Sequence, residues 1–253
     1  MYKINQFLKW LFNLFIIICI SAAGLSSEEC KAVNKGFAVV ELFTSEGCSD
    51  CPPADKNIIE LSKFDSSKNI YPLAFHVTYW DYIGWKDPYG KQEFTDRQEK
   101  YSSILGTGNY TPQAIVNGKI DIIGSRRTAL ISSIEKELAN IPIANIELNI
   151  IRKGSVLDVR YKLSCLAGNN VLNIALVEKG LSNTVTRGEN RSKTLSHENV
   201  VRVFRSVSLI KNIGVINLEF SGIEKNPGNF EIIAYAQDNK TFAISAATSG
   251  KIN

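Results

Sequence analysis

The sequence predicts an α/β domain over residues 36–141, followed by a small all-β sandwich domain over residues 144–253. Three observations carry this prediction. Between residues 37 and 140, apolar runs typical of buried strands alternate with segments of helical periodicity. From residue 145 onward, apolar and polar residues alternate, as they do in half-buried strands. Between the two patterns, Ile141-Pro142-Ile143 reads as a linker.

The first half is expected to follow the order β-α-β-α-β-β-α. Pro88 suits the first turn of the second helix, Asn117-Gly118 predicts a hairpin turn, and Ser125 is a candidate cap for the last helix. The strands are expected at residues 37–43, 70–77, 113–116 and 120–123, and the helices after Cys48, at 88–105 and around 130–138.

The second half carries six or seven alternating runs, which is typical of a small β-sandwich. Gly168, Gly214, Gly228 and Asn239 supply turn signals between them. The runs are expected at residues 146–150, 157–163, 172–176, 200–209, 214–220, 230–237 and 241–247.

Residues 1–23 are expected to form a signal peptide. Lys3 and Lys9 precede a run that is apolar except for Asn13, and small residues follow at 21–24. The run is shorter than the ~20 residues needed to cross a bilayer, although an uncleaved anchor stays open. We therefore expect a periplasmic or secreted protein without stable membrane insertion after cleavage. The net charge of +4 comes with no basic stripe, so no nucleic-acid partner is expected.

Cys48-Ser49-Asp50-Cys51 is the motif with the clearest chemistry, because it follows a predicted strand and opens a predicted helix. The N-terminus of a helix carries partial positive charge, which stabilises a thiolate. Cys48 lies nearer the loop and is the expected, more accessible nucleophile, whereas Cys51 would resolve the mixed disulfide. An exported protein also permits a second bridge between Cys30 and Cys165, with two free thiols as the alternative.

The element order and the CxxC motif resemble the thioredoxin superfamily. More narrowly, the chain is similar to an uncharacterised secreted bacterial family with the signature F-T-S-x-G-C-x-x-C-P-P-A-D. The residues that carry this similarity are 43–55, 76–88, 110–113 and 116–118. The resemblance implies a thioredoxin-like first domain and a redox pair at Cys48 and Cys51, but no particular substrate.

In the thioredoxin fold, the position of Thr111-Pro112 holds a cis proline that faces the two sulfurs and leaves backbone groups free for a substrate segment. Thr111 and Pro112 are therefore the expected substrate-binding residues. The chain departs from thioredoxins at Gly47 and Ser49-Asp50, where those proteins have Trp and Gly-Pro. Glu46 and Asp50 oppose thiolate formation, so we expect no extreme acidity of Cys48.

These features predict a thiol–disulfide oxidoreductase that needs no cofactor and no metal. Its expected partners are protein thiols or disulfides and a redox partner protein. Two alternatives stay open: a periplasmic protein that binds copper or another soft metal through Cys48 and Cys51, with His76 as a candidate third ligand, and a module whose CxxC is a structural disulfide. For His76 itself, a hydrogen bond in the protein interior is the simpler expectation.

Three further groups complete the set of candidates. Tyr79, Trp80, Tyr82 and Trp85 are expected to form a packed aromatic lid, with a substrate platform as the alternative. Asp81 and Asp87 are expected to be structural, as helix caps or turn formers. The polar segment 187–199, which contains Arg191 and His197, is predicted to lie against the first half near the CxxC motif rather than in solvent.

Overall fold

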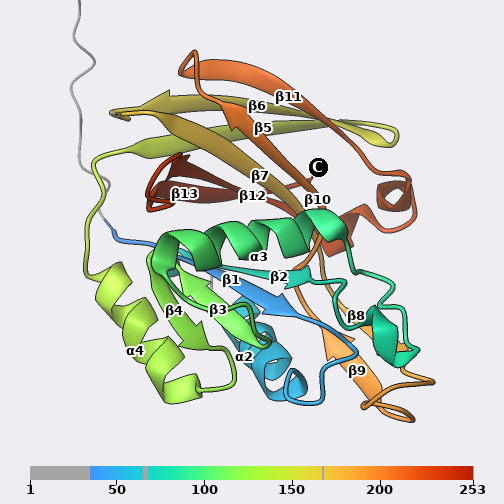
Figure 1. Ribbon diagram of the computed structural model, residues 1–253. Helices are drawn as coiled ribbons and strands as arrows, with labels where there is room; N and C mark the ends of the chain where they lie inside the picture. The colour runs from blue at the N-terminus through green and yellow to red at the C-terminus, as the bar shows by residue number, and fades with distance from the viewer. Residues whose placement is uncertain (1–34, 65–67, 167, 253) are drawn as a thin grey trace, which may run out of the picture. The chain divides into compact units, whose positions relative to one another are not determined.

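The computed structural model describes residues 35–64, 68–166 and 168–252 (Figure 1). The predicted signal peptide and Cys30 lie outside these residues, so the signal peptide and the predicted bridge from Cys30 to Cys165 stay predictions. In the first half the predicted order of elements is confirmed. The elements are β1 (Ala38–Thr44), α2 (Pro52–Ser62), β2 (Ile70–His76), α3 (Gln92–Leu105), β3 (Gln113–Val116), β4 (Ile120–Ile123) and α4 (Arg127–Leu138).

In the second half every predicted alternating run overlaps a strand, although the last strand begins at Ile244 and not at residue 241. Two short strands, β8 and β9, form a hairpin that the alternation did not predict. The strands are β5 (Asn145–Lys153), β6 (Val156–Ser164), β7 (Asn170–Glu178), β8 (Leu181–Thr184), β9 (Thr194–His197), β10 (Val200–Ser208), β11 (Ile213–Glu219), β12 (Phe230–Asp238) and β13 (Ile244–Lys251). Short 3-10 helices lie at Asp81–Ile83, Ser221–Glu224 and Pro227–Asn229.

The predicted fold class, a thioredoxin-like α/β domain followed by a separate small sandwich, is wrong. Strands from both halves form one mixed sheet of eight strands in the order β13-β12-β7-β10-β2-β1-β3-β4. The junction is the parallel pairing of β10 with β2, where Ala74 N–H donates to the carbonyl of Asn199 at 2.9 Å. The side chain of Asn199 also donates to the carbonyl of Pro72 at 2.8 Å. Backbone groups at the edge of β2 thus find partners 125 residues or more along the chain, which local periodicity does not encode.

The faces of this sheet are covered by different elements. Along β1, Val40 and Leu42 pack in one apolar cluster with α2 and α4, whereas Val39 and Phe43 pack in another with α3. Successive side chains of a strand point to opposite faces, so the alternation places α3 opposite α2 and α4. A second sheet in the order β11-β6-β5 packs on β7, β12 and β13 through a third apolar cluster.

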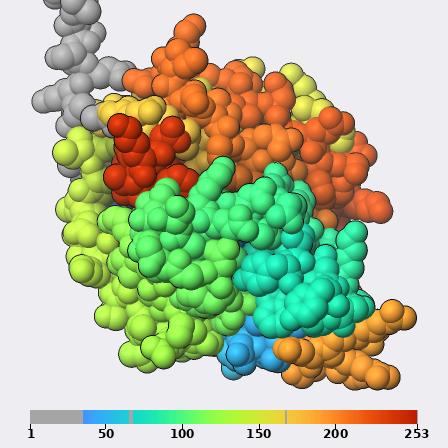
Figure 2. Space-filling model, viewed as in Figure 1, coloured from blue at the N-terminus to red at the C-terminus, as the bar shows by residue number. Residues whose placement is uncertain are grey.

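The β8–β9 hairpin forms its own two-stranded sheet. Asn183 of β8 donates to Glu46, two residues after the end of β1, at 3.0 Å. In Figure 2 the orange surface of this hairpin adjoins the blue surface of the segment that carries the CxxC motif. The sheet junction at β10 explains this placement, because β10 follows the hairpin directly and pairs with β2. The second half of the chain therefore reaches the expected redox site.

Candidate functional site

Cys48 and Cys51 form a disulfide at the N-terminal end of α2. Their Cα atoms are 5.4 Å apart, which confirms the prediction that the two residues are close enough to bridge. Cys51 is the residue before the helix, and Pro52 and Pro53 occupy the first turn, where N–H groups have no helical partner in any case. The strand β1 ends at Thr44, so the loop of residues 45–51 joins the sheet directly to the helix.

The two cysteines do not differ in exposure as the sequence predicts. Cys48 is 1% exposed and Cys51 is 0% exposed, whereas Ser49 and Asp50 between them are exposed. Only Ser49 and Asp50 of this loop are therefore exposed, while both cysteines are covered. Which cysteine is attacked first stays a prediction that rests on position in the motif.

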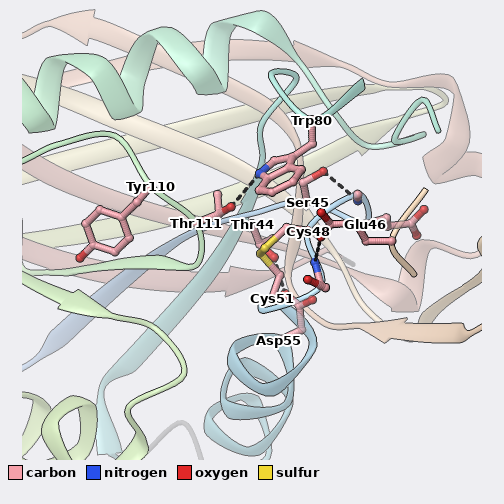
Figure 3. Close-up of a disulfide and its surroundings, with 12 residues drawn as sticks. Thr44, Ser45, Glu46, Cys48, Cys51, Asp55, Trp80, Tyr110 and Thr111 are labelled. Atoms are coloured by element: carbon pink, nitrogen blue, oxygen red, sulfur yellow. Dashed lines mark hydrogen bonds between the residues drawn. A yellow bond between two sulfur atoms is a disulfide. The ribbon is translucent and has the colours of Figure 1, made fainter. Parts of the chain in front are cut away.

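Thr111 and Pro112 lie before β3, and the peptide bond between them is cis, as predicted. Trp80 connects this segment to the CxxC loop. Its indole N–H donates to the hydroxyl of Thr111 at 2.8 Å, and its Cβ would lie 2.8 Å from a Cβ built on Gly47. In Figure 3 the indole lies beside the disulfide, with its nitrogen directed to Thr111. The role of Thr111 and Pro112 in substrate binding stays a prediction.

The aromatic group at residues 79–85 is only partly a packed lid. Trp85 donates its indole N–H to the buried carboxylate of Glu46 at 2.9 Å, and Trp80 is half-buried. Tyr82, in contrast, is 82% exposed and stacks on Trp80 with a centroid distance of 6.4 Å. Trp80 and Trp85 thus brace the CxxC loop, while Tyr82 presents an aromatic surface to solvent beside it.

Trp80 is positioned to control access to the disulfide. We expect that Trp80→Ala accelerates reduction of the disulfide by a small dithiol about ten-fold, because exchange requires a thiolate to reach sulfur. The measurement is the rate of dithiothreitol reduction under pseudo-first-order conditions. Tyr82→Ala, which removes an exposed ring that contacts Trp80, is the matched control and should leave the rate within two-fold. An unchanged rate in Trp80→Ala would assign the covering role to other side chains.

The predicted placement of segment 187–199 is confirmed. Asn190 is fully buried and donates from its side-chain amide to the carbonyls of Glu46 at 2.9 Å and Cys48 at 2.8 Å. The neighbouring Glu189 accepts a hydrogen bond from the backbone N–H of Ser49 at 3.1 Å. The segment includes β9 and the turn before it, so it is an ordered hairpin and not an extended loop.

Beneath the CxxC loop lies a cluster of five buried ionisable side chains, and it contains both histidines of the chain. The rings of His76 and His197 meet edge to face at a centroid distance of 4.9 Å. His76 Nδ1 lies 2.8 Å from Asp87, and His197 Nε2 lies 3.1 Å from Glu46. The fifth member is Asp55. Because His197 comes from β9, the cluster connects the hairpin to β2 and the CxxC loop.

Asp55 is the member that sequence reasoning missed. It lies one turn along α2 from Cys51, accepts a hydrogen bond from the hydroxyl of Thr44 at 2.9 Å, and lies 3.8 Å from His197 Nδ1 (Figure 3). Its position four residues after Cys51 was a usable signal, since residues i and i+4 share one face of a helix. Asp87 is structural, as predicted, and accepts backbone hydrogen bonds from Glu46 and Tyr89 besides its bond with His76.

Burial and mutual attraction set the charges of this cluster. Burial raises the pKa of Asp87, but His76 and two backbone N–H groups outweigh it and lower the pKa to about 2. Burial lowers the pKa of His76, but Asp87, Asp55 and Glu46 together raise it above the ordinary value. Burial raises the pKa of Asp55, although both histidines oppose the rise. His76 and Asp87 therefore form an ion pair, while Asp55 resists ionisation more than an exposed aspartate does.

Two ring nitrogens of the cluster, His76 Nε2 and His197 Nδ1, are buried without a hydrogen-bond partner among the described residues. In the described part of the chain, no group of three or more His, Cys, Asp or Glu side chains is placed to hold a metal ion. His76 is hydrogen-bonded in the protein interior, as predicted from the sequence. Within the described residues, the helices also lack the length and apolar character that a membrane crossing requires.

Two solved structures resemble this architecture. A protein of Agrobacterium tumefaciens is 25% identical, with a TM-score of 0.63, over 86% of this chain and 95% of its own. HBP35 of Porphyromonas gingivalis is 13% identical, with a TM-score of 0.62, over 88% of this chain and 77% of its own, and shows a likeness of fold alone. No curated protein matches the chain. The model of a family described as proteins of unknown function, DUF1223, matches residues 39–237, and the chain therefore belongs to this family.

Proposed function

We propose that the protein is a thiol–disulfide oxidoreductase that acts outside the cytoplasm, with Cys48 as the nucleophile and Cys51 as the resolving cysteine. The observation that carries the proposal is the Cys48–Cys51 disulfide at the N-terminal end of α2. Trp80 lies beside this disulfide and donates a hydrogen bond to Thr111. The basic and apolar residues at the N-terminus support export. The proposed partners are protein thiols or disulfides and a protein that restores the redox state of the pair.

The size of the closed loop supports a reactive rather than a structural bridge. A disulfide stabilises a fold mainly by restricting the unfolded chain, and this effect grows with the length of the loop. A bridge between residues three apart contributes about 2 kcal/mol in that model, whereas one across 100 residues contributes about 4.7 kcal/mol. Asn190 also binds this loop through the carbonyls of Glu46 and Cys48. The bridge therefore adds less to stability than a long-range disulfide would.

In the proposed reaction, a thiolate of the partner attacks the sulfur of Cys48 and the bond between Cys48 and Cys51 breaks. The partner is then joined to Cys48, and the sulfur of Cys51 leaves as a thiolate that takes up a proton. A second thiolate of the partner attacks the mixed disulfide, which releases an oxidised partner and a reduced protein. In the reverse direction, reduced Cys48 attacks a partner disulfide and Cys51 resolves the intermediate.

Cys51→Ser is expected to accumulate mixed disulfides between Cys48 and partner proteins, because the resolving thiol is missing. The variant is expressed with its native N-terminus, alkylated in acid, purified, and released with a reductant to identify the captured proteins. Cys48→Ser is the matched control and should capture at most a tenth as much. Equal capture by both variants, or none by either, would contradict the assigned roles.

Burial of both cysteines favours one alternative, a module with a structural disulfide. The reduction potential separates the two functions, since structural disulfides lie below about −300 mV and working pairs lie above it. The potential is obtained by equilibration with dithiothreitol or glutathione buffers and quantification of alkylated Cys48 and Cys51. A value below −300 mV together with no capture by Cys51→Ser would establish the structural role.

A further inference from the structure

The tip of the β8–β9 hairpin binds three backbone groups of the CxxC loop, between Glu46 and Ser49. The side-chain amide of Asn190 donates to the carbonyls of Glu46 and Cys48, and the carboxylate of Glu189 accepts from the N–H of Ser49. The tip itself is tightly built. Gly188 has a φ of 76° and lies so close to Ile83 that an added Cβ would meet Ile83 Cδ1 at 2.7 Å. The backbone on both sides of Glu189 is thus packed, while the Glu189 side chain itself is exposed and reaches the Ser49 N–H.

The N–H that Glu189 occupies is the first amide after Cys48. When the disulfide opens, a thiolate at Cys48 is stabilised by the N–H groups around the start of α2, and a charged acceptor gains more from such a donor than a neutral one. Glu189 already holds the Ser49 N–H with a carboxylate and so places a negative charge at the residue that follows Cys48. The two anions therefore compete for one donor and repel each other.

We propose that Glu189 is a positioning residue of the redox pair: its carboxylate occupies the Ser49 N–H in the disulfide form, competes with the Cys48 thiolate in the reduced form, and thereby favours the disulfide. The inference rests on the proposed thiol–disulfide function and names a residue that regulates it. It also makes the hairpin tip sensitive to the redox state. Coupling between two sites is reciprocal, so formation of the thiolate weakens the hold of Glu189 on the loop by the same factor.

Glutathione is the probe that tests this coupling. Two glutathione thiols reduce the protein and form one glutathione disulfide. The bond between Cys48 and Cys51 breaks, and each cysteine takes one of the two protons. Above its pKa, Cys48 releases its proton to solvent and the thiolate form draws the equilibrium toward the reduced protein. A negative charge near Cys48 raises that pKa and opposes reduction.

The informative variant is Glu189→Gln, since the amide oxygen retains an acceptor for the Ser49 N–H while the charge is removed. We expect the equilibrium constant for reduction by glutathione to rise about five-fold at pH 8, which is the size of an interaction between two exposed charges. Glu189→Ala, which removes both the charge and the acceptor, should shift the constant in the same direction. Glu219→Gln, an exposed change of equal charge in β11, is the control and should leave it unchanged.

The effect must depend on pH in a defined way. Well below the pKa of Cys48 the reduced protein has no thiolate, so the constants of Glu189→Gln and wild type should agree. The ratio of the variant's reduction constant to that of the wild type should rise as pH passes through the Cys48 pKa of the variant. It should become constant above the Cys48 pKa of the wild type. The other titratable groups of the CxxC loop, the hairpin and the buried cluster are the same in both proteins and cancel in the ratio: Glu46, Asp50, Asp55, His76, Asp87, Lys193 and His197.

The pKa of Cys48 is followed by thiolate absorbance at 240 nm and should be lower in Glu189→Gln than in wild type. A ratio within two-fold of one at every pH, with the Cys48 pKa unchanged, would overturn the inference. These measurements use glutathione alone and are distinct from the capture of partner proteins by Cys51→Ser. If the reduction constant shifts in Glu189→Gln but Cys51→Ser captures no partner, the inference stands and the proposed function is refuted. If Cys51→Ser captures partners but the constant does not shift, the proposed function stands and the inference is refuted.

Discussion

Arg97→Ala is expected to destabilise the protein by about 4 kcal/mol, the largest effect that we predict for one substitution. The guanidinium of Arg97 is buried and binds both carboxylate oxygens of Glu41, at 2.6 and 2.9 Å. It also donates to the hydroxyl of Tyr235 at 3.0 Å and to the side-chain carbonyl of Gln237 at 3.1 Å. Without the guanidinium, the carboxylate of Glu41, a residue that is only 1% exposed, has no counterion.

Urea unfolding followed by tryptophan fluorescence and by far-UV circular dichroism measures this loss. Because Arg97 lies on α3 while Glu41 lies on β1 and Tyr235 on β12, both halves of the chain should unfold in one transition, in wild type and variant alike. The double variant Glu41→Leu/Arg97→Met is the control, since an apolar pair avoids the uncompensated charge and should recover at least half of the loss. A loss below 1 kcal/mol in Arg97→Ala would mean that Glu41 is neutralised by other means.

Asp87→Asn is expected to cost about 3 kcal/mol of unfolding free energy at pH 5–6. The buried carboxylate is held ionised, with a pKa of about 2, by His76 and the backbone of Glu46 and Tyr89. Lowering a carboxylate pKa from 3.8 to about 2 corresponds to roughly 2–3 kcal/mol of stability. The amide of asparagine also leaves the protonated ring of His76 without its counterion, which adds to the cost.

The pH dependence of this loss has a definite sign. The pKa of Asp87 is depressed on folding, so its contribution is complete above its unfolded value near 3.9 and is lost as pH falls toward 2. The pKa of His76 is raised on folding, so its contribution is complete below its unfolded value near 6.5 and is lost as pH rises through the folded value. The difference between wild type and Asp87→Asn should therefore be greatest between about pH 4 and 6.5, as measured by urea unfolding across the pH range.

Asp96→Asn, an exposed change of equal charge on α3, provides the matched control and should stay within 0.5 kcal/mol of wild type at each pH. A constant difference from pH 3 to pH 9 would show that the loss comes from altered hydrogen bonding and not from the ion pair. The same experiment bears on function, because Asp87 binds the backbone of Glu46, two residues before Cys48. Trp85 donates a hydrogen bond to Glu46, so its fluorescence reports locally on movement of the redox loop.

Local sequence patterns were sufficient to predict the individual elements and the chemistry of the CxxC motif. Apolar runs and helical periodicity located β1, α2, β2 and α3, because these signals arise from neighbouring residues along the chain. The spacing of Cys48 and Cys51 before a helix predicted their bridge, and the unusual composition of residues 187–199 pointed to a surface near it. Each of these conclusions depends on residues close together in sequence.

The way in which the two halves combine became evident in three dimensions alone. The pairing of β10 with β2 makes one eight-stranded sheet, where the sequence predicted two separate domains, since alternation defines which face of a strand is apolar but not which strand lies beside it. That junction carries the β8–β9 hairpin to the CxxC loop and sets Glu189 and Asn190 on backbone groups about 140 residues away. It also buries His197 against His76. Hydrogen bonds and desolvation between such distant groups depend on three-dimensional proximity, and no local pattern encodes it.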